Sequence, residues 1–273
     1  MTQLLPILEF LVPALYAVAF ALYFRNFLNP DSSDSFYGPP ALKLTVAVHI
    51  GYLVVSGIVT EHFPIAAGSE FMSVLAAAIG AIYVLVEWRQ KETNTGVFFI
   101  GLVFLFQLAS SVLMQDATEV PMRSREALFS IHVIFTLMGF AALSIGALYA
   151  FMYVLLSRQL KSRELGLIFR RLPALATLEN MSKTATVAGV VVLGLGLALG
   201  HYFALGQAGT FNILDPIIIS ADLIWLTYFI GLIVVTTRGL SGLRIGYLSL
   251  IGYVVLMSSM VAIVTIFGGF HSF

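Results

Sequence analysis

The sequence predicts an all-α fold, a polytopic membrane helix bundle of about eight transmembrane helices with both termini extracytoplasmic. Hydrophobic residues make up 59% of the chain and charged residues only 10%, a balance that soluble domains do not have. Apolar runs of about twenty residues, enough to cross the hydrocarbon core, recur along the chain. Lysine and arginine fall almost entirely in alternate loops. We therefore expect residues 1–273 to form a single membrane domain, multi-pass in the inner (cytoplasmic) membrane.

The first apolar run has no basic leader and is continuous with a full span, so we expect it to be retained rather than cleaved as a signal peptide. The fifth run is long enough to tilt or to project beyond the bilayer. Gly139 and Gly146 on this run are expected to allow close contact with another helix. The predicted spans lie near residues 5–25, 42–60, 71–88, 96–115, 128–157, 184–206, 216–237 and 245–268.

The distribution of basic residues predicts the orientation, because basic loops stay cytoplasmic. Of the 14 lysines and arginines, all but Arg123 and Arg125 fall in the odd-numbered loops. The segment 158–183 is thus expected to be a cytoplasmic connection, with a short interfacial helix around Leu165–Leu178. The residues on the cytoplasmic side are Arg25, Lys43, Arg89, Lys91, Arg158, Lys161, Arg163, Arg170, Arg171, Lys183, Arg238 and Arg244.

The composition narrows the classes of function. The formal net charge is zero, so nothing indicates a nucleic-acid partner, and membrane lipids are the expected surroundings. The chain has no cysteine, which excludes disulfides, thiolate metal sites and thiol nucleophiles. No Ser/His/Asp order, Walker loop, HExxH or paired carboxylates point to catalysis, so the sequence favours a binding protein over an enzyme.

The five histidines form a pattern on this topology. His132 lies about one turn inside the outer end of the fifth span, and His271 follows the eighth span at the same face. His201 lies about two turns below the outer end of the sixth span, His62 belongs to an outer loop, and His49 lies toward the cytoplasmic side. Two imidazoles on facing helices can ligate haem iron from both sides, so His132 and His271 are the candidate pair. The alternative is that each is an interfacial side chain with its ring tip in water.

Arg123 and Arg125 are the exceptions to the charge pattern and stand just before His132. Guanidinium groups match carboxylates well, so the two arginines are candidates for binding the haem propionates. The alternative is a solvated loop in which they pair with neighbouring acidic residues. Because the chain has no CxxCH motif, the haem would be haem b, held non-covalently.

His49 and His201 lie inside predicted spans, where ionisable groups are costly and often mark a ligand or ion path. They are candidates for a second haem site or a transfer position. The alternative is that each donates a hydrogen bond to a backbone carbonyl of a neighbouring helix and stabilises the bundle. Asp222, on the seventh span, is expected to orient a histidine ring or to lie in a proton path.

Several segments, mainly within residues 125–273, resemble the membrane proteins of cytochrome c assembly, in particular the HemX/CcsA-like branch. These segments are Ile131-His132-Val133, Gly139-Phe140, Ala147-Leu148-Tyr149, Leu172-Pro173, Leu178-Glu179, Asp215-Pro216, Trp225, Tyr228, Arg238-Gly239 and the closing Phe270-His271-Ser272-Phe273. The resemblance implies that His132 and His271 are the external axial ligands of a haem.

The sequence departs from this family in two places. The tryptophan-rich external segment of haem-presenting members is replaced by Gly206-Gln207-Ala208-Gly209-Thr210-Phe211, so the resemblance does not extend to attachment of haem to apocytochrome c. Where larger members have a histidine before the Arg-Gly turn, this chain has Ile233-Val234-Val235. The resemblance therefore does not supply an inner haem position.

The leading hypothesis is a membrane haem-binding protein for haem handling or cytochrome c maturation, with other maturation or haem-biosynthesis proteins as partners. One alternative is a regulatory or scaffold protein of haem biosynthesis that contacts an enzyme through the loop from Arg158 to Lys183. Another is a small transporter that uses His49, His201 and Asp222 as polar steps across the bundle. The lack of an apparent inverted repeat speaks against the transporter.

Overall fold

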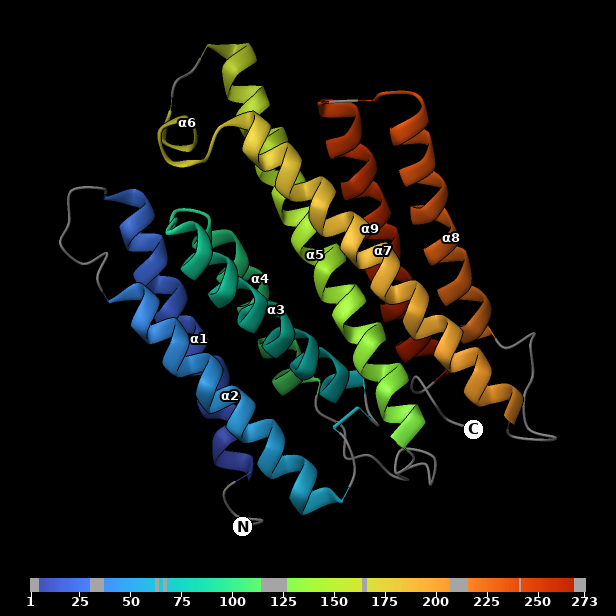
Figure 1. Cartoon of the computed structure of the whole chain (residues 1–273). Helices are drawn as coiled ribbons and strands as arrows, with labels where there is room; N and C mark the ends of the chain where they lie inside the picture. The colour runs from blue at the N-terminus through green and yellow to red at the C-terminus, as the bar shows by residue number, and fades with distance from the viewer. Residues whose placement is uncertain are drawn as a thin grey trace. The chain divides into compact units, whose positions relative to one another are not determined.

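The computed structural model describes residues 5–29, 37–61, 64–65, 68–113, 127–163, 166–206, 216–240 and 242–267, and every regular element in these ranges is an α-helix. The predicted all-helical membrane bundle is confirmed (Figure 1). The helices are α1 (Leu5–Leu28), α2 (Gly38–Thr60), α3 (Gly68–Gln90), α4 (Gly96–Val112), α5 (Ala127–Ser162), α6 (Leu167–Arg171), α7 (Leu175–Gly206), α8 (Pro216–Thr237) and α9 (Leu243–Phe267).

Each predicted span overlaps one helix of the described ranges. Six helices in the described ranges, α1, α2, α3, α5, α7 and α8, are long and apolar enough to cross a membrane, and α4 and α9 contribute shorter apolar stretches, Gly96–Val112 and Leu243–Ser259. The count of eight crossings and the extracytoplasmic position of the termini stay predictions. With 36 residues, α5 is about 54 Å long, which exceeds the hydrocarbon thickness as expected.

The stretch around Leu165–Leu178 differs in detail from its prediction. The short helix α6 occupies only Leu167–Arg171, and α7 already begins at Leu175. The hydropathy of the sequence had placed the start of this span near residue 184. The first turns of α7 carry polar side chains that are compatible with a helix, among them Glu179 and Lys183, which form an ion pair at 2.7 Å.

The helices fall into two compact units, Met1–Val120 and Pro121–Phe273, and the expectation of one membrane domain stays a prediction. In the first unit α1 packs against α2 and α4, and α3 completes the bundle by packing against the same two helices. Large aromatic side chains fill its interior, including Tyr16 and Tyr83, which are almost completely buried. At Gly96 an added Cβ would lie 2.3 Å from the ring of Tyr23, so only glycine fits there.

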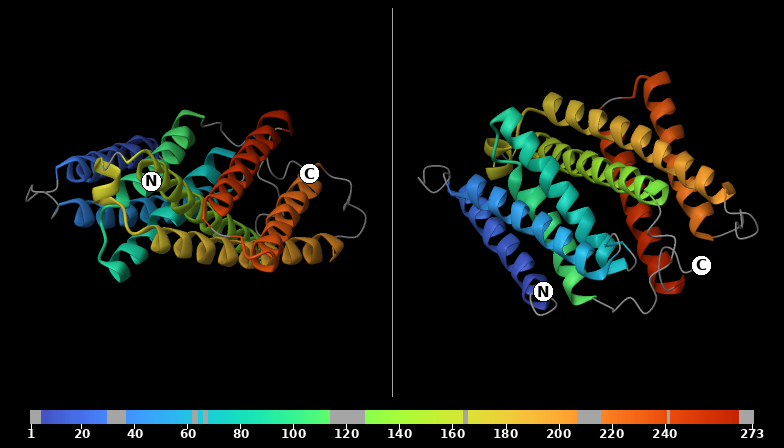
Figure 2. Two further views of the ribbon diagram at one scale, coloured as in Figure 1. Left: turned by 90° about the horizontal axis from the view of Figure 1, so that it is seen from above. Right: turned by 60° about the horizontal axis from the view of Figure 1, so that its bottom comes forward.

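In the second unit, the long antiparallel pair of α5 and α7 is the main packing contact (Figure 2). A Cβ added to Gly139 of α5 would lie 2.7 Å from the Cα of Leu193, and one added to Gly146 would lie 2.6 Å from Oγ1 of Thr186. Membrane helices approach closely where small residues line the interface, because dispersion contacts between backbones replace the hydrophobic effect. The close contact expected at Gly139 and Gly146 is therefore confirmed.

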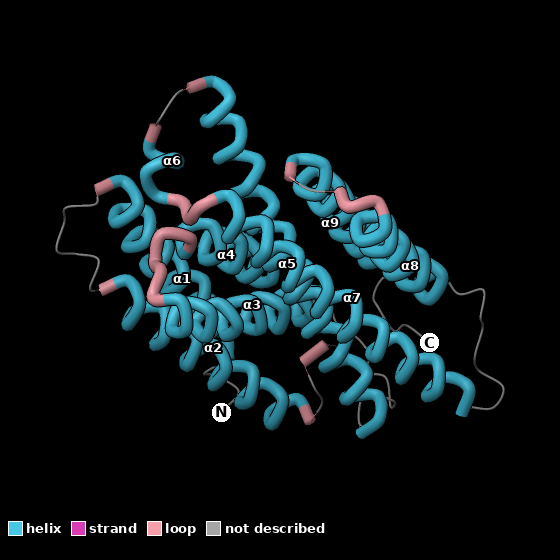
Figure 3. The backbone as a smooth tube through the Cα atoms, turned by 45° about the horizontal axis from the view of Figure 1, so that its top comes forward, coloured by secondary structure: helices cyan, strands magenta, loops and turns pink. Residues whose placement is uncertain are grey.

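Apart from the short helix α6, two more helices of this unit, α8 and α9, extend the pair into a group of four long helices. α9 packs against α5, and α8 packs against both α7 and α9, which lie side by side with it in Figure 3. Since α5 and α7 are antiparallel, the start of α5 and the end of α7 lie at the same end of the unit. This end carries His132, His201 and Asp222.

Candidate functional site

His132 lies in the second turn of α5, facing the glycine-rich end of α7. Its Nδ1 is 2.7 Å from the backbone carbonyl oxygen of Gly196. A Cβ added to Gly200 would lie 2.6 Å from Cε1 of His132, so the imidazole occupies the space that this glycine leaves open. The rings of Phe129 and Phe203 form the aromatic neighbourhood, with Phe129 6.2 Å from His132 and 5.8 Å from Phe203 between ring centroids.

The contact with Gly196 determines the tautomer of His132. A carbonyl oxygen only accepts hydrogen bonds, so Nδ1 must carry the proton and donate it. In the neutral ring the lone pair then lies on Nε2. Metal-binding histidines commonly have one ring nitrogen held by a carbonyl or carboxylate in this way, because the bond fixes the ring and raises the basicity of the other nitrogen. The geometry of His132 thus fits a metal ligand.

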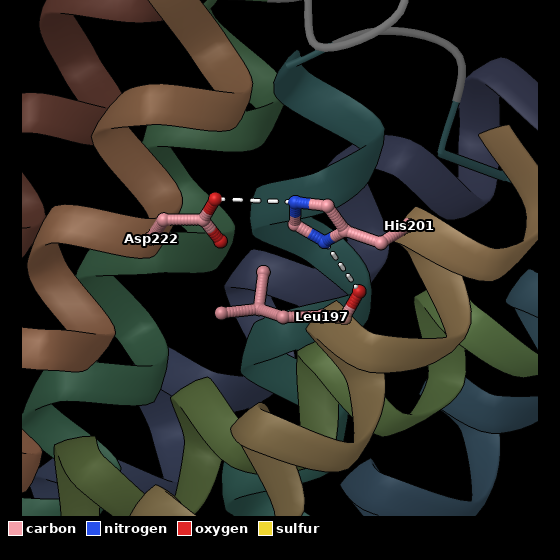
Figure 4. Close-up of polar contacts among 3 residues, drawn as sticks. All are labelled: Leu197, His201 and Asp222. Atoms are coloured by element: carbon pink, nitrogen blue, oxygen red, sulfur yellow. Dashed lines mark hydrogen bonds and ion pairs between the residues drawn. The ribbon is translucent and has the colours of Figure 1, made fainter. Parts of the chain in front are cut away.

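His201 has a different set of partners (Figure 4). Its Nδ1 is 2.9 Å from the carbonyl oxygen of Leu197, and its Nε2 is 3.2 Å from Oδ2 of Asp222 on α8. Both partners are acceptors, so the ring donates to both of them only when each of its nitrogens carries a proton. In this arrangement His201 offers no lone pair to a metal. The expectation that Asp222 orients a histidine ring is confirmed.

His49 lies at the centre of the first unit, where it is completely buried. Its Nδ1 is 3.1 Å from the hydroxyl of Tyr16 on α1, and its Nε2 is 3.0 Å from Oγ of Ser73 on α3. Ser73 in turn donates to Oε1 of Gln107 on α4 at 3.0 Å. Because the Ser73 proton is committed to Gln107, Ser73 accepts from Nε2–H of His49, and Nδ1 accepts from Tyr16.

The four side chains Tyr16, His49, Ser73 and Gln107 therefore form one directional hydrogen-bond chain with one member from each helix. Each of them is at least 97% buried. This is the bundle-stabilising role that we gave as the alternative for His49, although its partners are side chains rather than carbonyls. The assignment of His49 and His201 to a second haem site stays a prediction.

A model of the family described as "Cytochrome C assembly protein" matches residues 44–267. The chain belongs to this family. Protein HemX of Brevibacillus brevis is 24% identical over 227 residues, which cover 80% of this chain and 80% of that protein. Cytochrome c biogenesis protein CcsA of Guillardia theta is 26% identical over 264 residues, with 87% and 84% covered. No solved structure matches the chain.

The family predicted from the motifs of the second half is thus confirmed, and the match reaches further toward the N-terminus than the resemblance over residues 125–273. Within this cytochrome c assembly protein, His49, His132 and His201 lie inside the matched range and His271 lies beyond its end. His271, Arg123, Arg125 and His62 fall outside the residues that the structure describes. Their assignments as ligands or propionate partners stay predictions.

Other polar residues of this cytochrome c assembly protein were missed in the sequence. Glu87 of α3 is only 6% exposed, and the hydroxyl of Tyr23 donates to its Oε2 at 2.5 Å. Tyr16 and Tyr23 are seven residues apart on α1, a spacing that places them on one helix face and could have indicated the polar interior. Among the described residues no group of three or more His, Cys, Asp or Glu is placed to hold a metal ion.

Proposed function

We propose that this protein binds haem b non-covalently in the inner membrane, with His132 and His271 as axial ligands at the extracytoplasmic side. The observation that carries the proposal is the bond between His132 Nδ1 and the Gly196 carbonyl, which places the lone pair of the neutral ring on Nε2, the nitrogen that would ligate iron. Bound haem would supply an iron centre that two imidazoles keep six-coordinate and low-spin. The task that fits is haem handling or cytochrome c maturation.

The names of the similar proteins support a role in haem handling or cytochrome c maturation. One group carries the name HemX and the other is named for cytochrome c biogenesis, and the alignments cover at least 80% of this chain in both. The surroundings of His132 also suit a porphyrin. Phe129 and Phe203 offer apolar aromatic surface beside the ring, while Arg123 and Arg125 would bind the propionates from the preceding segment.

Optical spectroscopy of the detergent-purified protein tests the proposal. Wild-type protein reconstituted with haem should show the Soret, α and β bands of a six-coordinate low-spin haem b. His132→Ala and His271→Ala should each lose this spectrum and bind haem at least about tenfold more weakly. Added imidazole should restore the low-spin bands of His132→Ala, because it replaces the missing ligand without repairing any packing.

Thr227→Val is the control, since it changes an exposed side chain of α8 in the same unit. Its spectrum should stay low-spin, because the Thr227 hydroxyl bonds only to the Leu223 carbonyl of its own helix. A wild-type protein without a Soret band would contradict haem binding. Recovery of a haem-biosynthesis enzyme bound through residues 158–183 would then favour the scaffold function instead.

A further inference from the structure

The last part of α7 is rich in glycine, with Gly194, Gly196 and Gly200 within about two turns of the helix. Glycine weakens a helix because its backbone loses the most conformational freedom on folding. Such a segment depends on its neighbours to keep one position. That position matters here, because the Gly196 carbonyl accepts the bond from His132 Nδ1.

Two consecutive backbone carbonyls of this segment each accept a hydrogen bond from a histidine ring. The Gly196 oxygen accepts from His132 of α5 at 2.7 Å, and the Leu197 oxygen accepts from His201 at 2.9 Å. His201 belongs to α7 itself, and Asp222 of α8 holds its other nitrogen at 3.2 Å (Figure 4). Asp222 therefore connects α8 to the same turn of α7 that supports His132.

A second contact shows that one face of α8 is directed at α7. Trp225 donates from Nε1 to the Val190 carbonyl at 2.8 Å, and the same nitrogen is 2.8 Å from the place that a Cβ on Gly194 would take. Asp222 and Trp225 are three residues apart and so lie on one helix face. Trp225 contacts α7 at Val190 and Gly194, whereas Asp222 reaches the following turn through His201.

We propose that Asp222, acting through His201, is a positioning residue for His132. The pair holds the turn containing Gly196 and Leu197 in place and thereby sets the strength of the hydrogen bond from His132 Nδ1. This bond governs the basicity of Nε2, the atom proposed to ligate iron. The link to iron rests on the proposed function, while the effect on His132 itself does not require haem.

The first test uses the full-length protein without haem. Asp222→Asn keeps the shape of the side chain and removes its charge. Backbone amides of residues 196–206 should exchange with deuterium about two- to fivefold faster, as expected when an ion pair between half-exposed groups is lost. In ¹⁵N spectra of labelled histidines, the signals of His132, identified with His132→Gln, should show a weaker hydrogen bond at Nδ1.

Two control variants separate positioning from a general loss of packing. Asp222→Glu keeps a carboxylate and should preserve both the exchange rates and the His132 signals. Thr227→Val removes an exposed hydroxyl of α8 that is bonded to the Leu223 carbonyl of its own helix, and it should behave as wild type. Unchanged exchange and unchanged His132 signals in Asp222→Asn would overturn the proposal.

The second test measures the midpoint potential of the haem-loaded protein. Asp222→Asn should raise the potential, because a weaker bond at Nδ1 makes Nε2 a poorer donor to ferric iron, whereas Asp222→Glu should leave it unchanged. A constant potential despite altered His132 signals would disprove the link to iron. If wild-type protein bound no haem, the proposed function would fail, and the haem-free measurements would still decide whether Asp222 positions His132.

Discussion

The hydrogen-bond chain through His49 makes a quantitative prediction about the first unit. His49→Leu fills a similar volume but removes both ring nitrogens, so the bonds to Tyr16 and Ser73 are lost. Ser73 keeps its bond to Gln107, whereas the buried hydroxyl of Tyr16 keeps a proton with no acceptor. A hydrogen bond between membrane helices contributes about 0.6 kcal/mol on average, and two are lost here. A buried donor that is left without an acceptor costs up to about 3 kcal/mol. We expect a loss of about 1–3 kcal/mol in unfolding free energy.

A double-mutant cycle isolates the part of this loss that belongs to the pair. Tyr16→Phe removes the hydroxyl that His49→Leu would orphan, so the double variant should be more stable than the sum of the single effects by about 1 kcal/mol. Unfolding is followed by reversible titration with SDS in mixed micelles. In a Trp225→Phe background, Trp88 of α3 is the remaining tryptophan and reports on the first unit.

Thr60→Val is the control for this cycle, because its hydroxyl bonds to the Ser56 carbonyl of its own helix. The effects of Thr60→Val and Tyr16→Phe on the free energy of unfolding should add within about 0.5 kcal/mol in the double variant. Additivity of His49→Leu with Tyr16→Phe would refute the hydrogen-bond chain. A changed haem spectrum in His49→Leu, together with such additivity, would point instead to His49 as a haem ligand.

Two further predictions concern packing and a buried carboxyl, both measured by unfolding in detergent. Gly139→Leu should destabilise the second unit by about 3 kcal/mol or more, because the new Cβ would collide with the backbone of Leu193. Gly51→Ala is the control, because no atom lies within 4 Å of its new Cβ. It should be neutral or stabilise the protein by up to about 1 kcal/mol. Glu87→Leu should lower the free energy of unfolding by about 1–3 kcal/mol, because the buried Tyr23 hydroxyl loses its acceptor. Glu87→Gln keeps a carbonyl oxygen at this place and should lower the free energy of unfolding by less than about 1 kcal/mol. A Gln variant as unstable as the Leu variant would contradict the role of this bond.

The sequence predicted where the helices lie because hydropathy reports directly on burial in lipid. It misplaced the start of α7, since Glu179 and Lys183 lower the hydropathy but are good helix formers. The interfacial helix predicted around Leu165–Leu178 is correspondingly divided between α6 and the first turn of α7. Hydropathy marks the part of a helix that lies in lipid, whereas helix propensity and capping help to determine where the helix begins.

The rotation of each helix could not be predicted. In a soluble helix the apolar stripe shows which face is buried, but membrane helices are apolar on all sides, so this signal is lost. Glu87 and Trp88 are neighbours near the C-terminal end of α3, yet Glu87 is 6% exposed and Trp88 is 68% exposed. For the same reason Ser73 and Gln107 could not be recognised as partners of His49. Asp222 was an easier case, because it is a rare charge close to the end of its span.

The partners of the three described histidines, rather than their depth in the membrane, distinguish what each can do. His49 accepts a hydrogen bond from one hydroxyl and donates to another, each on a different helix, so it joins helices. His201 faces two acceptors, the Leu197 carbonyl and the Asp222 carboxylate, so both of its ring nitrogens are engaged. His132 faces a carbonyl at Nδ1, which fixes the proton there and directs the lone pair to Nε2. Two glycines make this possible, because Gly196 brings its carbonyl close to α5 and Gly200 leaves room for the ring. Residues without chemistry of their own therefore determine which imidazole is suited to bind a metal.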